Sequence, residues 1–180
     1  MNSSHIYVDE TKAKGYLVAA ATGIPSQLAV SRKEIGALIL PGQRSLHMKA
    51  ESDARKRKIA NTIVTMGETL GIKAVIYDAG RDGTEKERRS RCLKALVNDA
   101  AKYERAKIVF DLDETLRSWD RQQMIELTRA AGAGERISYE HYVRNSEPLL
   151  AIPDTIAWCW ARGGEWRARI RPVVQDVIDV

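Results

Sequence analysis

The sequence predicts a mixed α/β fold, in which a central β-sheet opens with an antiparallel hairpin and is flanked by helices. Two apolar runs near the N-terminus, His5 to Asp9 and Tyr16 to Thr22, are separated by a polar break at Lys14-Gly15, which is typical of a β-hairpin. Further along the chain, short continuous apolar runs alternate with amphipathic segments of helical period. A β-rich start followed by alternating helices and strands indicates a mixed sheet with helices on its faces.

The individual elements follow from periodicity and from helix start and stop signals. We expect a helix over Ser31 to Leu40, because Pro41-Gly42 ends it, and a short strand over Ser45 to Lys49. Ser52 or Asp53 can cap a long helix that stops at Gly71. The later expected elements are a strand at Lys73–Tyr77, a helix at Thr84–Tyr103, a strand at Lys107–Phe110, a helix at Arg117–Ala131, a strand at Ile137–Val143 and an apolar helix at Leu149–Arg162.

Length and composition place the chain among ordinary globular proteins. A chain of 180 residues predicts one domain spanning residues 1–180. No apolar run approaches the roughly 18 residues needed to cross a bilayer, and the polar N-terminus lacks the apolar stretch of a signal peptide. We therefore expect a cytoplasmic protein that does not enter membranes. The net charge is +5, and basic residues cluster at Arg55–Lys58, Lys86–Lys94 and Arg162–Arg171, a distribution that suits a polyanionic partner.

Three aspartates are the main candidates for chemistry. Asp9 ends the first apolar run, Asp111 follows the run Lys107–Phe110, and Asp154 lies in the first turn of an otherwise apolar helix. Each has a plain structural alternative, as a turn residue, part of a solvated acidic loop, or a charge that complements a helix dipole. A carboxylate among apolar residues, however, is stabilised by a partner cation, and hard oxygen ligands select Mg²⁺ or Mn²⁺. We predict that Asp9, Asp111 and Asp154 form one divalent-metal site.

One local segment resembles the first motif of haloacid-dehalogenase-like phosphatases. It is Ile108-Val109-Phe110-Asp111-Leu112-Asp113-Glu114-Thr115-Leu116. The resemblance implies that Asp111 is a nucleophile and Asp113 a general acid–base. That family places this motif near the start of its domain, whereas only 64 residues follow Leu116 here, without a convincing lysine or paired-acid motif. A phosphatase is therefore kept as the alternative.

A second resemblance covers nearly the whole chain. The chain resembles a bacterial family of uncharacterised ribonuclease-H-like proteins, whose short motifs occur here in the same order. The counterparts are Tyr7-Val8-Asp9-Glu10-Thr11, Leu46-His47-Met48, Val109-Phe110-Asp111 and Ser146-Glu147-Pro148-Leu149-Leu150-Ala151-Ile152-Pro153-Asp154. Thr11, Ala151 and Pro153 depart from the family pattern, but the acidic positions are intact.

The resemblance implies a carboxylate cluster at the sheet edge that binds one or two Mg²⁺ or Mn²⁺ ions. Asp9 would bridge the metals, Asp111 and Asp154 would complete the site, and Glu10 or Asp113 would add further ligands. Two metals would activate water and stabilise the leaving oxygen in phosphodiester hydrolysis. The implied nucleic-acid contacts are His47, Lys49, Arg55, Arg88 and Arg89.

Other assignments stay open at the level of sequence. The chain could be a metal-dependent nuclease, the phosphatase described above, or a non-catalytic accessory protein that retains the fold. DNA and RNA substrates are not distinguished, and a homo-oligomer is left open. Trp158, Trp160 and Trp166 lie on or just beyond an apolar helix, so we expect them to pack in the core rather than stack on bases.

Overall fold

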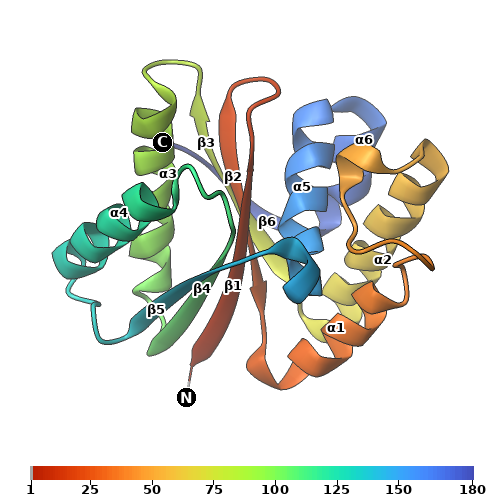
Figure 1. Cartoon of the computed structure of the whole chain (residues 1–180), viewed down its shortest axis with the longest axis horizontal. Coiled ribbons are helices and arrows are strands. Elements are labelled where there is room, and N and C mark those ends of the chain that lie inside the picture. Colours follow the sequence, from red (N-terminus) through yellow and green to blue (C-terminus); the bar gives the residue numbers. More distant parts are fainter. Residues whose placement is uncertain (1) are drawn as a thin grey trace.

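A six-stranded mixed sheet with helices on both faces forms the protein, as the computed structural model of residues 2–180 shows (Figure 1). The strands and main helices, in chain order, are β1 (Ser3–Thr11), β2 (Tyr16–Gly23), α1 (Leu28–Gly36), α2 (Asp53–Leu70), β3 (Lys73–Gly80), α3 (Glu85–Ala100), β4 (Arg105–Asp111), α4 (Arg117–Ala130), β5 (Ile137–Tyr142), α5 (Ala151–Arg162), α6 (Gly164–Ile170) and β6 (Val174–Asp179).

The strand order across the sheet is β5-β4-β1-β2-β3-β6. β1, β2 and β3 pair antiparallel in sequence order, whereas β4 joins β1 and β5 joins β4 in parallel. β6 pairs in parallel with β3 at the opposite edge. The predicted mixed α/β sheet with an antiparallel N-terminal hairpin and flanking helices is therefore confirmed.

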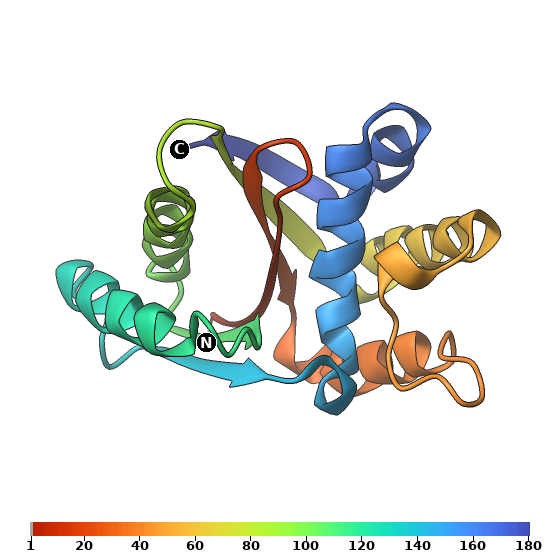
Figure 2. The same cartoon turned by 45° about the horizontal axis from the view of Figure 1, so that its top comes forward.

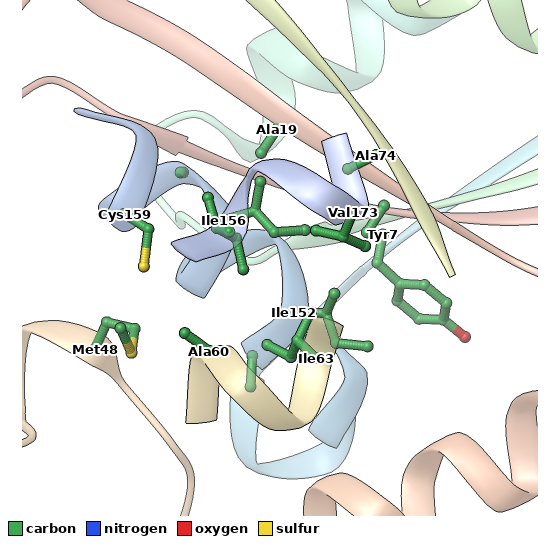
Figure 3. Close-up of a cluster of buried hydrophobic side chains, with 14 of the residues drawn as sticks. Tyr7, Ala19, Met48, Ala60, Ile63, Ala74, Ile152, Ile156, Cys159 and Val173 are labelled. Carbon is green, nitrogen blue, oxygen red and sulfur yellow. The ribbon is translucent and has the colours of Figure 1, made fainter. Parts of the chain in front are cut away.

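Helices cover the two faces of the sheet in separate groups (Figure 2). α3 and α4 lie on one face, and α1, α2, α5 and α6 lie on the other. The side chains of β1 alternate between the two layers, as the period of two requires: Tyr7 packs in the α5 layer, whereas Ile6 and Val8 pack in the α3 layer. Figure 3 shows the α5 layer, where Ile152 and Ile156 of α5 pack with Ile63 of α2.

α2 begins and ends where the sequence predicts, whereas α3 begins as predicted but ends at Ala100, before the expected Tyr103. The Ser52 hydroxyl caps α2 by accepting from the Arg55 amide, and Gly71 ends the helix in the left-handed region at φ 73°. Thr84 and Glu87 form a reciprocal capping box at the start of α3. These local signals define both ends of α2 and the start of α3.

Three expectations about local structure are corrected. The predicted strand Ser45–Lys49 is instead an extended segment followed by a 3₁₀ turn over Met48–Ala50. Leu46 and Met48 are buried while His47 is exposed. This apolar–polar alternation is typical of a strand, but here the two buried side chains anchor a loop to the core. The first helix begins at Leu28 and ends at Gly36, earlier than expected. α6 and β6 were missed, because their sequences carry many charges.

Among residues 2–180, no helix combines the length and the apolar character needed to cross a bilayer.

Ile156 tests how strongly the α5 layer stabilises the fold, because its side chain is fully buried. Ile156→Ala should lower the free energy of unfolding by about 2–5 kcal/mol, and Ile156→Val by only about 0.5–1.5 kcal/mol. Urea unfolding followed by circular dichroism measures both. The matched control is Val30→Ala on α1, whose side chain is exposed, and its effect should stay within about 0.5 kcal/mol. Equal losses for Ile156→Ala and Val30→Ala would contradict the assigned packing.

Candidate functional site

The sheet brings Asp9 and Asp111 to the same edge and the same face. β1 and β4 run parallel with Tyr7 opposite Val109 and Val8 opposite Phe110. Asp111 ends β4, and Asp9 lies beside it on β1, which continues to Thr11. Tyr7 and Val109 both pack in the α5 layer, and two residues further on each strand returns to that face. Asp9 and Asp111 therefore share the face that α5 covers.

Asp154 reaches the same edge from the first turn of α5. That helix packs across β1, and nine of its residues are buried. The Asp154 carboxylate is fixed from the side by the loop before α2, because its Oδ2 accepts a hydrogen bond of 2.9 Å from the Met48 amide. His47, one residue earlier, has its Nδ1 at 3.7 Å from the same oxygen. The segment Ser45–Lys49, which was predicted to be a strand, is thus a loop that orients Asp154.

Arg144 joins the three aspartates. Its Nη2 donates to Asp9 Oδ2 at 2.8 Å and also to Asp111 Oδ2, while its Nη1 lies 3.1 Å from Asp154 Oδ2. The sequence prediction missed this residue, although a signal was present. β5 pairs in parallel with β4, Tyr142 stands opposite Asp111, and Arg144 follows two residues later. A basic residue just past a strand that neighbours Asp111 is a natural counterion for that aspartate.

The cluster holds more negative than positive charge. Three ionised carboxylates facing one guanidinium leave a formal charge of −2, and the side chains of Asp9, Asp154 and Arg144 are only 10%, 13% and 11% exposed. Burial and the carboxylates of Asp154 and Glu10 raise the pKa of Asp9 well above its usual value, against the opposing effect of Arg144. Burial disfavours the charged form of Arg144, but the carboxylates of Asp154, Asp9 and Asp111 outweigh burial and raise its pKa. The site stabilises positive charge.

Arg144 is also incompletely bonded. The Nη1 nitrogen forms an ion pair with Asp154 Oδ2 at 3.1 Å. Within residues 2–180, this buried Nη1 has no hydrogen-bond acceptor. This nitrogen is enclosed and lies 3.1 Å from the Asp154 carboxylate, so the ion pair offsets the cost of the missing hydrogen bond.

The aspartate cluster opens into a cavity of about 450 Å³ at the edge of the sheet. Every predicted metal ligand borders this cavity, together with one predicted nucleic-acid contact and the missed arginine. The lining residues are Asp9, Glu10, His47, Asp111, Leu112, Asp113, Glu114, Thr115, Arg144 and Asp154. The structure therefore gathers the predicted residues at one accessible place.

Glu10 points to the other face of the sheet, where it meets a buried arginine. Glu10 Oε2 lies 3.1 Å from Arg89 Nη1. Arg89 also forms a two-pronged pair with Asp120, both bonds measuring 2.7 Å, and donates to the Tyr16 hydroxyl. The predicted role of Arg89 as a nucleic-acid contact is corrected, since only 3% of its side chain is exposed and its donors are engaged inside the protein.

The other predicted basic contacts lie outside the cavity. Lys49 is exposed on the turn after His47. Arg55 pairs with Glu51 at 3.1 Å and donates to the Leu38 carbonyl, so it holds the loop before α2 in place. Arg88 is half-buried on α3, on the opposite face of the sheet from Asp154.

Asp113 lines the cavity but is fixed in a turn. Its Oδ1 accepts from both the amide and the hydroxyl of Thr115. The side-chain bond from Thr115 is the main cause that lowers the pKa of Asp113, although partial burial opposes it. The Asp113 carboxylate is therefore stabilised in its ionised form.

The donor set of the cavity is chemically suited to a hard divalent cation, because carboxylate oxygens are the ligands that Mg²⁺ and Mn²⁺ prefer. In the arrangement of residues 2–180, no three histidine, cysteine, aspartate or glutamate side chains are grouped to hold a metal ion. The three aspartates turn their oxygens toward the guanidinium of Arg144. The arginine thus occupies the position of greatest negative charge.

Comparison with protein-family models and with curated protein sequences found no match to this chain.

Replacing Arg144 tests the charge balance of the cluster. Arg144→Gln removes the positive charge and should lower the free energy of unfolding by about 3–5 kcal/mol near neutral pH, as breaking a buried ion pair does. Urea unfolding in EDTA measures the loss. The matched control is Arg129→Gln at an exposed position of α4, which should change stability by less than about 0.5 kcal/mol. A neutral effect of Arg144→Gln would show that the aspartates do not depend on it.

The raised pKa of Asp9 gives a pH dependence with a defined sign. The folded protein holds the Asp9 proton more tightly than the unfolded chain does. This contribution to stability is complete below the unfolded pKa of about 3.9 and is lost as the pH rises through the folded pKa. Asn cannot ionise, so Asp9→Asn removes this loss of stability. The variant should be more stable than wild type at about pH 7, and the difference should shrink toward about pH 4.

Urea unfolding in EDTA across this pH range measures both proteins. Asp179→Asn, at an exposed position of β6, serves as the control and should follow the wild-type curve. Parallel curves for wild type and Asp9→Asn would contradict the raised pKa.

Proposed function

We propose that the protein is a ribonuclease-H-like nuclease that hydrolyses phosphodiester bonds of nucleic acid with Mg²⁺ or Mn²⁺. The observation that carries this proposal is the meeting of three carboxylates from β1, β4 and α5 around one incompletely bonded guanidinium. The mixed sheet supports the fold assignment, because an antiparallel β1-β2-β3 unit continues through β1 into parallel β4 and β5.

Asp9, Asp111 and Asp154 would hold the metal. Their formal charge of −2 in the presence of Arg144 matches a divalent cation, and the cavity gives access from solvent. When bound, the metal would activate water and stabilise the leaving oxygen of the phosphodiester. The protein already supplies rigid supports for these ligands, since two of them lie on the paired strands β1 and β4 and the third is held by the Met48 amide.

Arg144 would bind the phosphate of the substrate. Its side chain borders the cavity beside the three aspartates, and guanidinium groups bind phosphate oxygens through paired donors. His47 is half-exposed at the same wall, with its ring near Asp154. From there the imidazole can contact the nucleic-acid chain next to the reacting phosphate. Both residues therefore have roles in holding the substrate rather than in breaking the bond.

Two details favour a nuclease over the phosphatase alternative. A phosphatase of the type considered would use Asp113 as a general acid–base, and such a group works best with a pKa near the operating pH. The bonds from Thr115 lower the pKa of Asp113 instead. A phosphatase built on Asp111 and Asp113 would also leave Asp154 without a role, although Asp154 shares Arg144 with Asp111.

Asp154→Asn separates the proposed activity from its alternatives. The wild-type protein should cleave members of a panel of single- and double-stranded DNA and RNA with Mn²⁺ or Mg²⁺. The variant should be slower by about 10²–10³-fold, because a catalytic metal contributes several kcal/mol to the transition state. Mn²⁺ should also raise the thermal unfolding midpoint of wild type more than that of the variant, since a ligand stabilises the state that binds it. Asp179→Asn is the matched control for both measurements.

Hydrolysis of a simple phosphate monoester that survives Asp154→Asn and is lost in Asp111→Asn would identify the phosphatase. Absence of cleavage across the panel, together with no effect of Mn²⁺ on unfolding, would favour a non-catalytic accessory protein.

A further inference from the structure

α5 presents a single narrow stripe of accessible side chains. Asp154, Trp158 and Arg162 follow one another at intervals of four residues, and the nine other residues of the helix are buried. Residues four apart lie on the same face of a helix. The stripe therefore starts at the aspartate cluster and runs to the C-terminal end of α5, a length of about 12 Å at 1.5 Å per residue.

The middle of the stripe combines an aromatic ring with a cation. Trp158 is half-buried, in contrast to Trp160 and Trp166, which are buried as the sequence predicts. The Lys56 ammonium lies over the Trp158 ring at 4.7 Å from its centre, and Trp166 packs against Trp158 edge to face. Lys56 is paired with Asp53 Oδ1 at 3.6 Å and its side chain is only 12% exposed, so it positions the Trp158 ring rather than standing free in solvent. Trp158 is thus held in place by its neighbours, and it is partly rather than fully buried.

The far end of the stripe carries two exposed cations from different elements. The Lys14 ammonium, on the β1–β2 connection, donates to the carbonyl of Arg162 at 3.4 Å. Figure 2 shows this connection beside the C-terminal end of α5. Neither Lys14 nor Arg162 forms an ion pair with another residue of 2–180. Their positive charges are therefore available to an external anion.

The near end has a further exposed cation. Lys49 follows Met48, whose amide holds Asp154, so this lysine lies close to the aspartate cluster. We refer to Trp158 and Arg162 of α5, with Lys14, Lys49 and Lys56 around them, as the α5 track. These residues come from four separate elements or connections of the chain. The sequence prediction included Lys49 among the nucleic-acid contacts, but it treated the tryptophans as core residues.

We propose that the α5 track binds single-stranded nucleic acid and leads it into the aspartate cluster. Cations spaced along a polyanion neutralise its phosphates, and a tryptophan ring between them gives a base or sugar an apolar surface. The length of the stripe accommodates about three stacked nucleotides at roughly 3.4 Å each. The proposal rests on the proposed function only for the end of the track at which the strand is cleaved, which would be the Asp154 end.

The track favours a single strand over a duplex for a physical reason. In a duplex the bases are stacked on each other, so a flat ring on a helix surface has no exposed base face to contact. In a single strand each base can leave its neighbour and stack on an aromatic side chain. Trp158 is the aromatic residue of α5 that is not fully buried, and it lies between Asp154 and Arg162 along the stripe, with Lys56 over its ring.

Binding without catalysis tests the α5 track. Labelled single-stranded DNA and RNA of about 12 nucleotides, and the corresponding duplexes, are titrated with protein in EDTA and followed by fluorescence anisotropy. Wild type should bind the single strands more tightly than the duplexes. Arg162→Ala and Lys14→Ala should each reduce the slope of log affinity against log salt by about 0.7, the contribution of one phosphate contact in a single strand.

Trp158→Ala should weaken single-strand binding by about tenfold, the loss expected from one stacked base, whereas Trp158→Phe should retain most of the affinity. Circular dichroism checks that each variant is folded. If Trp158→Ala does not fold, Arg162→Ala and Lys14→Ala still test the α5 track. The matched control is Arg129→Ala, which removes an exposed arginine from α4 on the other face of the sheet. It should leave binding unchanged.

The outcomes distinguish this proposal from the proposed function. Wild type that fails to bind single strands, duplex binding that equals single-strand binding, or track variants that match the Arg129→Ala control would each overturn the α5 track, even if Mn²⁺-dependent cleavage is present. Loss of single-strand binding in the track variants would support it, even if no cleavage is found.

Discussion

The alternation of side chains along β1 determines where the charges of this protein lie. Because successive residues of a strand point to opposite faces, Asp9 turns toward α5 and Glu10 turns toward α3. Each then meets an arginine, Arg144 on one face and Arg89 on the other. Two charge clusters therefore lie on opposite faces of β1, and the peptide bond between Asp9 and Glu10 connects them.

The two clusters differ in how well their charges are matched. On the α3 face, Arg89 is enclosed by Asp120, Glu10 and the Tyr16 hydroxyl, and the His141 ring lies 3.4 Å from Asp120. Buried charges persist when they are paired and hydrogen-bonded in this way. On the α5 face, three aspartates share Arg144, and one nitrogen of that side chain has no hydrogen-bond acceptor within residues 2–180. The first cluster is a completed structural unit, whereas the second retains negative charge and an unused donor beside a cavity.

The sequence contained enough information for five of the six strands and for three of the four residues at the centre of the aspartate cluster. Apolar runs and caps identified β1 to β5 and the long helices, and strand ends pointed to Asp9 and Asp111. Arg144 was missed because its partner strands are adjacent only in the folded sheet. Arg89 was misassigned for a related reason: periodicity places an arginine on a helix face but does not reveal a buried Asp120 opposite it. β6 was missed because a charged edge strand lacks the apolar pattern of a buried one.

The aspartate cluster can form only after the segment that carries Arg144 and Asp154 has been synthesised. Asp9 and Arg144 are 135 positions apart, and Asp154 follows later still. α5, which covers β1, and β6, which completes the sheet at β3, both come from the last third of the chain. Contacts between such distant segments form slowly, because the intervening chain must first be ordered. During synthesis, the hairpin that carries Asp9 therefore leaves the ribosome long before α5 can cover it. Over that interval the part of the sheet face under α5 lacks this cover, and transiently exposed apolar surface of this kind promotes aggregation.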